Sequence, residues 1–121
     1  VLFKPPPLLV QYAEQNGDHL STRDRVVKRV IAVPGDTVAT DAAGEVFIDG
    51  LLRPGLSSTG SCSTCRPPTY TIDPLRVPEG QLLVLGDNRG SSADSHMWGF
   101  LSREQVEGCV FWRLLAWPHI G

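Results

Sequence analysis

Short apolar runs rich in Val, Leu and Ile alternate along this chain with turn residues, above all Pro, Gly, Asp and Asn. Runs of this length bounded by such residues predict β-strands joined by turns. Asp49-Gly50, between two apolar pairs, predicts a two-residue hairpin, and the capping-box sequence at residues 102–105 predicts one short helical turn. The predicted strands are residues 1–4, 25–33, 37–40, 45–48, 51–53, 69–72, 81–85 and 109–117.

Composition supports a small domain and adds little about chemistry. The chain of 121 residues is 41% hydrophobic and carries a net charge of −2, which fits one domain, residues 1–121, with its own core. Its 12 glycines and 10 prolines favour a mainly β fold over helices. Residues 55–68 are rich in Ser, Thr and Gly and are predicted to be a loop insertion. Without a basic patch, nucleic acid is not an expected partner.

The segment at residues 86–99 has the sequence Gly-Asp-Asn-Arg-Gly-Ser-Ser-Ala-Asp-Ser-His-Met-Trp-Gly. It follows the predicted strand 81–85, and core packing gives no reason for so many hydroxyls and charges in one stretch. Polar loops held in place by a rigid scaffold are common catalytic sites. We therefore expect this loop to carry the function of the protein.

A second segment, residues 26–36, is a β-branched strand interrupted by Lys28 and Arg29 and closed by a Pro-Gly turn. Neighbouring side chains on a strand point to opposite faces, so one of the two cations is expected to face inward. Burial disfavours the charged ammonium and lowers the pKa of a lysine, which makes a neutral amine available as a general base. Taken without the polar loop, Lys28 is more simply interpreted as a side chain reaching from a strand edge into solvent.

Together these segments resemble the type I signal peptidases, which have a Lys-Arg strand ending in Pro-Gly-Asp and a later Gly-Asp-Asn-Arg-x-x-Ser-x-Asp-Ser-Arg-x-Trp-Gly block. The resemblance covers residues 26–38 and 77–108 well and residues 1–4 weakly. It implies a signal-peptidase-type folded antiparallel β-sheet and a Ser-Lys dyad, with no metal and no other cofactor. By resemblance, Lys28 is the general base, Ser92 orients it, and the structural lining of the site is Asp87, Asn88, Arg89, Asp94, Ser95 and His96.

His96 departs from the family pattern, which usually has Arg after Asp-Ser. The customary ion pair with Asp94 is therefore expected to be weaker or to depend on pH. The Asp-Ser-His sequence before Trp-Gly most resembles the cyanobacterial and plastid members, the thylakoidal processing peptidases. We do not expect His96 to be the base, because the family uses lysine and the arginine that His96 replaces is not catalytic.

Plain structural roles compete with these assignments. Ser92 resembles the many serines that cap turns, and Asp87 is expected to hold the loop by accepting backbone amide hydrogens. Arg89 is expected to pair with a carboxylate. The spacing of Ser92 from Gly86 along the chain is what favours its family role.

The resemblance also implies features that these 121 residues lack. Family members carry the nucleophilic serine in a Ser-Met-x-Pro segment just after an N-terminal transmembrane anchor, and neither that segment nor an apolar run of about 20 residues is present. We therefore expect a catalytic-domain fragment, inactive alone, of a longer membrane-anchored peptidase whose catalytic domain faces the thylakoid lumen or periplasm. Its expected substrates are precursor proteins with small residues one and three positions before the cut.

Two other functions stay open at this point. A self-cleaving repressor-type Ser-Lys protease would carry a DNA-binding domain, and the Asp-Ser-His-x-Trp-Gly block and the lack of basic character argue against it. A binding relative that has lost its nucleophile is the second alternative. Upstream sequence separates them, because Ser-Met-x-Pro after an apolar span supports the peptidase.

Cys62 and Cys65 form a Cys-x-x-Cys pair in the loop at residues 55–68. The pair could be a loop disulfide, a redox switch, half of a zinc site or two unpaired thiols. Zinc needs about four ligands, and neither Cys109 nor the scattered histidines have ligand-like spacing, which disfavours a metal. Cys109 is predicted to be a small buried residue at the start of the last strand.

Overall fold

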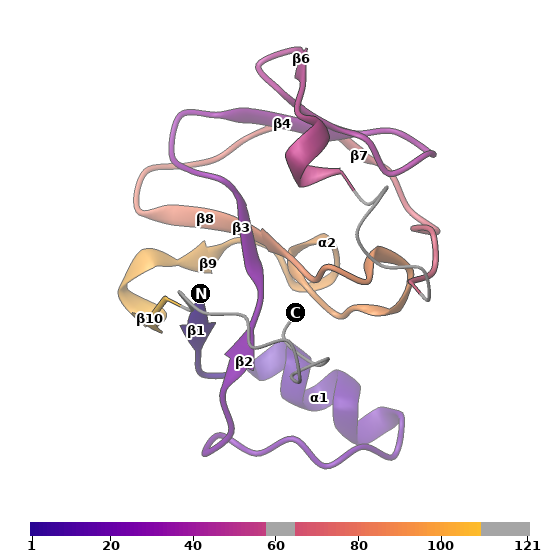
Figure 1. Cartoon of the computed structure of the whole chain (residues 1–121). Coiled ribbons are helices and arrows are strands. Elements are labelled where there is room, and N and C mark those ends of the chain that lie inside the picture. The colour runs from indigo at the N-terminus through magenta and orange to yellow at the C-terminus, as the bar shows by residue number, and fades with distance from the viewer. Residues whose placement is uncertain (58–64, 110–121) are drawn as a thin grey trace.

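The computed structural model describes residues 1–57 and 65–109, which form short strands with a few helices (Figure 1). The helices are α1 (Pro7–Gln15), α2 (Ser95–Trp98) and three 3₁₀ turns, η1 (Pro54–Leu56), η2 (Arg89–Ser91) and η3 (Arg103–Gln105). The strands are β1 (Leu2–Phe3), β2 (Val26–Val27), β3 (Arg29–Ala32), β4 (Thr37–Thr40), β5 (Val46–Ile48), β6 (Leu51–Leu52), β7 (Ile72–Arg76), β8 (Gln81–Leu85), β9 (Leu101–Ser102) and β10 (Val106–Gly108).

The strands of this part of the chain form three small sheets, in the orders β10-β1-β2, β3-β8-β9 and β6-β5-β4-β7. Every pairing is antiparallel. The predicted mainly β, antiparallel fold is therefore confirmed. Because β2 and β3 belong to different sheets, the single residue between them, Lys28, lies where two sheets meet.

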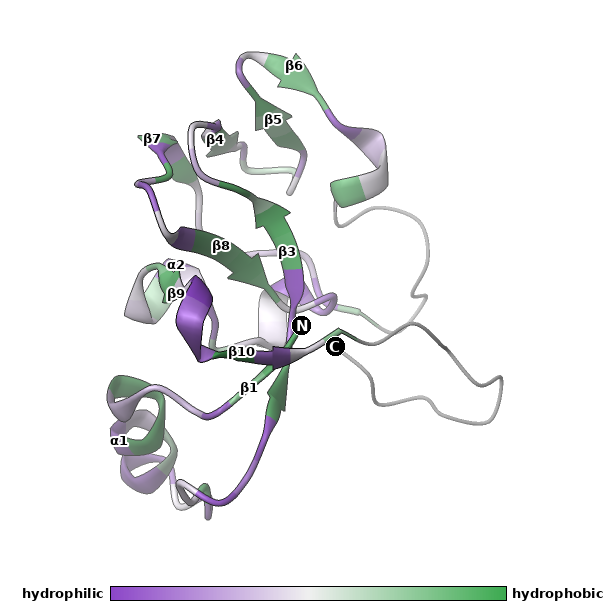
Figure 2. Ribbon diagram, turned by 90° about the vertical axis from the view of Figure 1, so that its left-hand side faces the viewer, coloured by the Kyte–Doolittle hydropathy of each residue, from purple (hydrophilic) through white to green (hydrophobic). Residues whose placement is uncertain are grey.

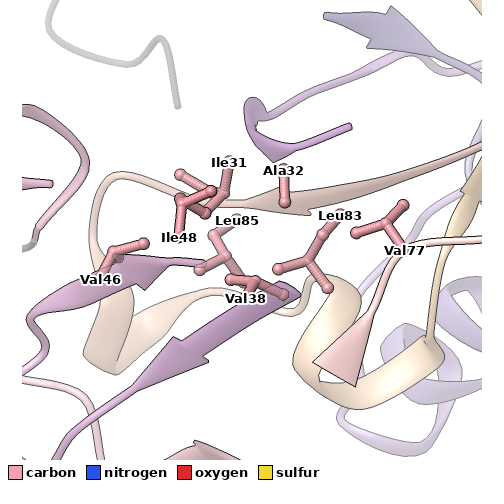
Figure 3. Close-up of a cluster of buried hydrophobic side chains, with 8 residues drawn as sticks. All are labelled: Ile31, Ala32, Val38, Val46, Ile48, Val77, Leu83 and Leu85. Carbon is pink, nitrogen blue, oxygen red and sulfur yellow. The ribbon is translucent and has the colours of Figure 1, made fainter. Parts of the chain in front are cut away.

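Strand β8 is the structural centre of the fold, since both of its faces are buried. Leu83 and Leu85 point into one core cluster and Leu82 and Val84 into the other. A strand covered on both faces has a continuous apolar sequence, which explains the run at residues 81–85. The first cluster, drawn in Figure 3, joins β8 to β3, β4 and β5 and consists of Ile31, Ala32, Val38, Val46, Ile48, Val77, Leu83 and Leu85.

The hydropathy of the ribbon follows these layers. In Figure 2 the ribbons of β3, β5 and β8 are mostly hydrophobic, whereas the connection from α1 to β2 is mostly polar. Among the described residues, no helix has both the length and the apolar character needed to cross a membrane.

Most predicted strands are present, and two of them, residues 37–40 and 81–85, have the predicted bounds. The strand predicted at residues 69–72 is wrong except for its last residue, because β7 runs over Ile72–Arg76. β7 contains Pro74, a residue without an N–H, which is tolerated there because β7 is an edge strand. The strand predicted at 25–33 is interrupted at Lys28, between β2 and β3.

The prediction of a single helical turn underestimated the helices. The turn at 102–105 is present as η3, but α1 was missed. Its start has a recognisable signal, proline at the first helical position, and Leu9 and Ala13 bury one face at i, i+4 spacing. At the other end of the sequence, Cys109 is exposed and outside any strand, which corrects its predicted burial, and residues 110–117 lie outside the described residues.

Candidate active site

Lys28 and Arg29 have different surroundings, as the alternation of a strand predicts. Arg29 is exposed, whereas Lys28 is half-buried at the junction of the two sheets. The Lys28 backbone is held on both sides, because its N–H donates to the Val1 carbonyl at 3.1 Å and its own carbonyl accepts from the Val1 amino group at 2.5 Å. The lysine side chain therefore leaves a fixed point of the backbone.

The Lys28 amine lies next to the polar loop that follows β8. Its Nζ donates a hydrogen bond to Ser92 Oγ at 2.8 Å, across 64 positions of sequence. Burial lowers the pKa of Lys28, and the negative charges of Asp94 and Asp87 oppose that shift only in part. The structure thus brings together the two residues that the resemblance made a pair, with an amine biased towards its neutral form.

Gly86, the first residue after β8, leaves the space that this contact needs. A Cβ placed on Gly86 would lie 2.0 Å from Ser92 Oγ, 2.6 Å from Ser92 Cβ and 3.3 Å from Lys28 Nζ. Glycine is needed here for its small size, since heavy atoms cannot approach this closely. Sequence reasoning used Gly86 only to mark the start of the motif. A glycine directly after a strand, where other atoms approach closely, was the available signal.

Asp94 anchors the loop from inside. Its carboxylate is fully buried and accepts from the Gly86 N–H at 3.0 Å and from the His96 N–H at 3.2 Å. The second contact caps the N-terminus of α2. Asp94 is also paired with His96 Nδ1. Next to it, Ser95 Oγ accepts from the Val84 N–H at 2.9 Å.

Arg89 has partners other than the predicted carboxylate. It is 4% exposed, and it donates to the backbone carbonyls of Gly86 at 2.9 Å and Leu56 at 2.6 Å. Burial lowers the pKa of Arg89. The expected partner was wrong because a guanidinium with several donors can also be satisfied by carbonyls that the loop would otherwise leave unpaired. Arg89 thus ties the polar loop to the segment that follows β6.

Asp87 forms an ion pair that sequence reasoning missed. Its two carboxylate oxygens accept from Arg29 Nε at 2.7 Å and from Arg29 Nη2 at 3.0 Å. The hydrogen bond to Asp87 raises the pKa of Arg29. The expectation for Asp87 was a role in the turn, and the bidentate pair adds a link between the loop and β3. The two cations next to each other in the sequence therefore both bind the same loop.

The segment at 55–68, predicted to be a loop insertion, contacts the polar loop through its described ends. Arg66 N–H donates to Asn88 Oδ1 at 3.0 Å, and the Arg66 carbonyl accepts from the Gly90 N–H at 3.1 Å. Cys65 is disulfide-bonded, while Cys62 lies outside the described residues, so its pairing with Cys65 stays a prediction. Within residues 1–57 and 65–109, no group of His, Cys, Asp or Glu is placed to hold a metal ion.

Tyr70 is a further residue near the site that sequence reasoning did not identify. Its ring is stacked on that of His96, with centroids 3.7 Å apart and planes at 5°. Tyr70 lies in the segment that was predicted to be a strand, and nothing in the local sequence indicates its contact with His96.

The arrangement suits proton transfer. An amine that is partly removed from water and held by one hydroxyl can keep a lone pair available for a second hydroxyl. The surrounding bonds from Asp94, Arg89 and Asp87 fix the backbone of the loop that carries Ser92. The site is thus built as a rigid support for one lysine.

Comparison with known proteins agrees with this geometry. Residues 1–117 match the family described as "Signal peptidase, peptidase S26". The chain is 40% identical over 98 residues to probable signal peptidase I-2 of Synechocystis, covering 81% of this chain and 42% of the relative. It is 36% identical over 118 residues to thylakoidal processing peptidase 1, chloroplastic, of Arabidopsis thaliana, covering 98% of this chain and 31% of the relative.

A solved structure is similar as well. The crystal structure of a signal peptidase I from Enterococcus faecalis aligns with a TM-score of 0.54 and 27% identity, over 90% of this chain and 92% of that one. The chain spans less than half the length of the two relatives named above, 42% and 31%.

Proposed function

The chain belongs to the signal peptidase family S26, and from this membership we propose that it is the catalytic domain of a serine endopeptidase that removes N-terminal signal or transit peptides from translocated proteins. The observation that carries the proposal is the 2.8 Å contact between Lys28 Nζ and Ser92 Oγ, at a lysine whose pKa is lowered by burial. This is the environment that a general base requires.

In the proposed mechanism, Lys28 activates a serine that lies outside these 121 residues, in a longer protein that contains them. The neutral amine takes the serine proton as the serine oxygen attacks the scissile carbonyl carbon. The resulting ammonium gives that proton to the leaving amine nitrogen, which leaves an acyl-enzyme. Lys28, neutral again, then takes a proton from the water that attacks the acyl ester, and the ammonium returns that proton to the serine oxygen as the ester bond breaks and the new carboxyl end leaves.

Ser92 has a positioning role in this scheme. By accepting one N–H of the Lys28 amine it restricts the rotation of that group and so limits the directions in which the nitrogen lone pair can point. Gly86, Asp94 and Arg89 hold Ser92 and its loop in turn. We propose the roles of Asn88 and Ser95 as structural, since each bonds a backbone N–H.

The proposed substrates are precursors with small residues one and three positions before the cut. The proposed setting is a membrane-anchored protein with this domain on the far side of the membrane, in the thylakoid lumen or the periplasm. The relatives that support this setting are probable signal peptidase I-2 of Synechocystis and thylakoidal processing peptidase 1, chloroplastic, of Arabidopsis thaliana.

The test uses a longer protein that joins this chain to a family-type anchor and serine segment. The sequence contains two lysines, so Lys4→Met, at an exposed position, is a matched control for Lys28→Met. We expect Lys28→Met to abolish precursor cleavage and Lys4→Met to leave it unchanged. Ser92→Ala should slow cleavage by roughly 10²-fold, in the range of positioned proton-transfer groups.

Two results would overturn the proposal. Cleavage by Lys28→Met at the wild-type rate would remove lysine as the base. Cleavage by the 121-residue chain alone would show that the nucleophile lies within it. Binding of precursor without any cleavage by the longer protein would instead support a non-catalytic relative.

A further inference from the structure

Two aromatic rings, those of Tyr70 and His96, are stacked beside the polar loop. Tyr70 comes from the segment before β7 and His96 from α2, and the 5° angle between their planes makes the contact nearly parallel. Neither ring contributes to the hydrogen bond between Lys28 and Ser92. The two rings are nevertheless connected to that hydrogen bond through neighbouring residues.

The connection runs through a fully buried carboxylate. His96 Nδ1 is paired with Asp94 Oδ1, and the other oxygen, Asp94 Oδ2, accepts from the Gly86 N–H at 3.0 Å. Gly86 is the residue on which an added Cβ would lie only 2.0 Å from Ser92 Oγ. We therefore expect a rotation of the His96 ring to shift the Asp94 carboxylate, and a shift of that carboxylate to move the Gly86 backbone, which has no spare room beside Ser92.

The His96 ring has space into which it can turn. A cavity of about 210 Å³ lies beside the stacked rings, with Tyr70, His96 and Leu83 among its walls. Histidine side chains have a broad preference at the torsion that rotates the ring, so local backbone geometry does not select one orientation. Two contacts hold the observed plane: the bond from His96 Nδ1 to Asp94 and the flat face of Tyr70.

The hydroxyl of Tyr70 makes no hydrogen bond to the site. Its oxygen is buried and has no hydrogen-bond partner in the described part of the chain. Burial and then the charge of Asp94 raise the pKa of Tyr70 to about 12, so the phenol stays neutral at ordinary pH. A buried unpaired hydroxyl costs stability, and replacing it by hydrogen removes that cost.

We propose that Tyr70 is a positioning residue whose ring holds His96, and through Asp94 the Gly86 backbone, in the arrangement that fixes Ser92 against Lys28. The positional effect stands on the contacts alone, while its importance for catalysis rests on the function proposed above. The property required is a flat ring at this position. Phenylalanine should satisfy it, and an aliphatic side chain should not.

The first experiment follows Lys28 by NMR in the 121-residue chain with isotope-labelled lysine. The sequence has two lysines, and Lys4→Met assigns their signals. In Tyr70→Leu we expect the Lys28 pKa to move up towards the ordinary lysine value, because the loosened loop admits water to the amine. Tyr70→Phe should keep the wild-type titration, and so should Tyr12→Leu, which changes the other tyrosine of the chain.

Two further variants separate this pathway from general loosening. Val46→Ala weakens the core cluster on β5 and should leave the Lys28 titration unchanged. In a His96→Ala background, Tyr70→Leu should have no further effect, because the stacked partner is gone. An unmoved Lys28 titration in Tyr70→Leu, an equal shift in Val46→Ala, or an undiminished shift in the His96→Ala background each overturns the proposal.

The second experiment measures cleavage by the longer protein. Tyr70→Leu should lower kcat by about 10- to 100-fold with little change in KM, as expected for a displaced catalytic group, and Tyr70→Phe should restore the rate. If Lys28→Met still cleaves precursor while Tyr70→Leu shifts the Lys28 titration, the proposed function fails and the positioning role stands. If Tyr70→Leu leaves both the titration and kcat unchanged, the positioning role fails alone.

Discussion

Gly86→Ala is the smallest substitution that tests how the site is built, because it adds one carbon where the structure has no room. The new Cβ would lie 2.0 Å from Ser92 Oγ and 2.6 Å from Ser92 Cβ, while an ordinary contact begins at 3.4 Å. The backbone of Gly86 is held on both sides, by Asp94 at its N–H and by Arg89 at its carbonyl. Ser92 is therefore the group that has to move.

The size of the movement follows from these distances. Ser92 Oγ has to retreat by about 1.4 Å, the difference between 2.0 and 3.4 Å. The bond from Lys28 Nζ is 2.8 Å long, and a retreat of this size directed away from the amine takes it well past the roughly 3.2 Å limit of an N–H···O bond. Overpacking of this kind costs about 1–3 kcal/mol of unfolding free energy. A misplacement of about 1 Å costs around 10²-fold in rate.

The assay is a double-mutant cycle in urea on the 121-residue chain. Ser92→Gly removes both of the atoms that clash, so Gly86→Ala should lose most of its cost in that background. Gly55→Ala is the matched control, since nothing lies within 4 Å of its added Cβ, and it should change the unfolding free energy by less than about 0.5 kcal/mol. In the longer protein, Gly86→Ala should reduce precursor cleavage by about 10²-fold, and the Ser92→Gly background should restore stability without restoring cleavage.

The reasoning is refuted if Gly86→Ala costs the same free energy with and without the Ser92 side chain. That result would mean that the loop backbone, rather than Ser92, takes up the added carbon. A Gly86→Ala protein that is as stable as Gly55→Ala and cleaves normally would refute the close approach itself.

Four further outcomes follow from the site. Because burial lowers the pKa of Lys28, cleavage should rise with pH through that lowered value, and a flat kcat/KM profile would contradict the base assignment. Between the lowered and the ordinary pKa of Lys28, the folded chain binds fewer protons than the unfolded chain. Lys28→Met should therefore be more stable than the wild-type chain below that pH window, and the difference should disappear as pH rises through it. Urea unfolding at several pH values checks this sign. Asp87→Asn should cost less than about 1 kcal/mol in unfolding free energy, because its partner Arg29 is 51% exposed, and a loss above 2 kcal/mol would argue against that view. Arg89→Met leaves two carbonyls without a donor and should cost about 1–3 kcal/mol or more, so an unchanged urea midpoint would contradict its role.

Some contacts of the site depend only on features that a sequence shows. The alternation of side chains along a strand separates Lys28 from Arg29 whatever the rest of the fold does. The apolar run at residues 81–85 requires a strand buried on both faces, and β8 is such a strand. The polar loop after it was identifiable as a site because core packing gives no reason for so many hydroxyl and charged side chains in one stretch.

The pairing of the loop with its supports depended on tertiary structure. Lys28 and Ser92 are 64 positions apart, and Arg29 and Asp87 are 58 apart, so their contacts depend on how β3 and β8 pair. Without the family resemblance, the sequence names a candidate lysine and a candidate loop but not their distance. Arg89 shows the same limit, since one of its two carbonyl partners is Leu56, 33 positions away in the segment that follows β6.

Local sequence determined most of the strand pattern, the inward direction of one of two neighbouring cations and the polar loop of this protein, because each depends on residues next to one another in the chain. The tertiary structure alone decided that Gly86 has no space for a side chain, that Pro74 is tolerated at a sheet edge, and that Tyr70 stacks on His96. Each of these depends on atoms brought together by folding. Propensity and alternation describe a residue and its neighbours in sequence, whereas steric room, edge position and ring stacking are properties of the neighbours in space.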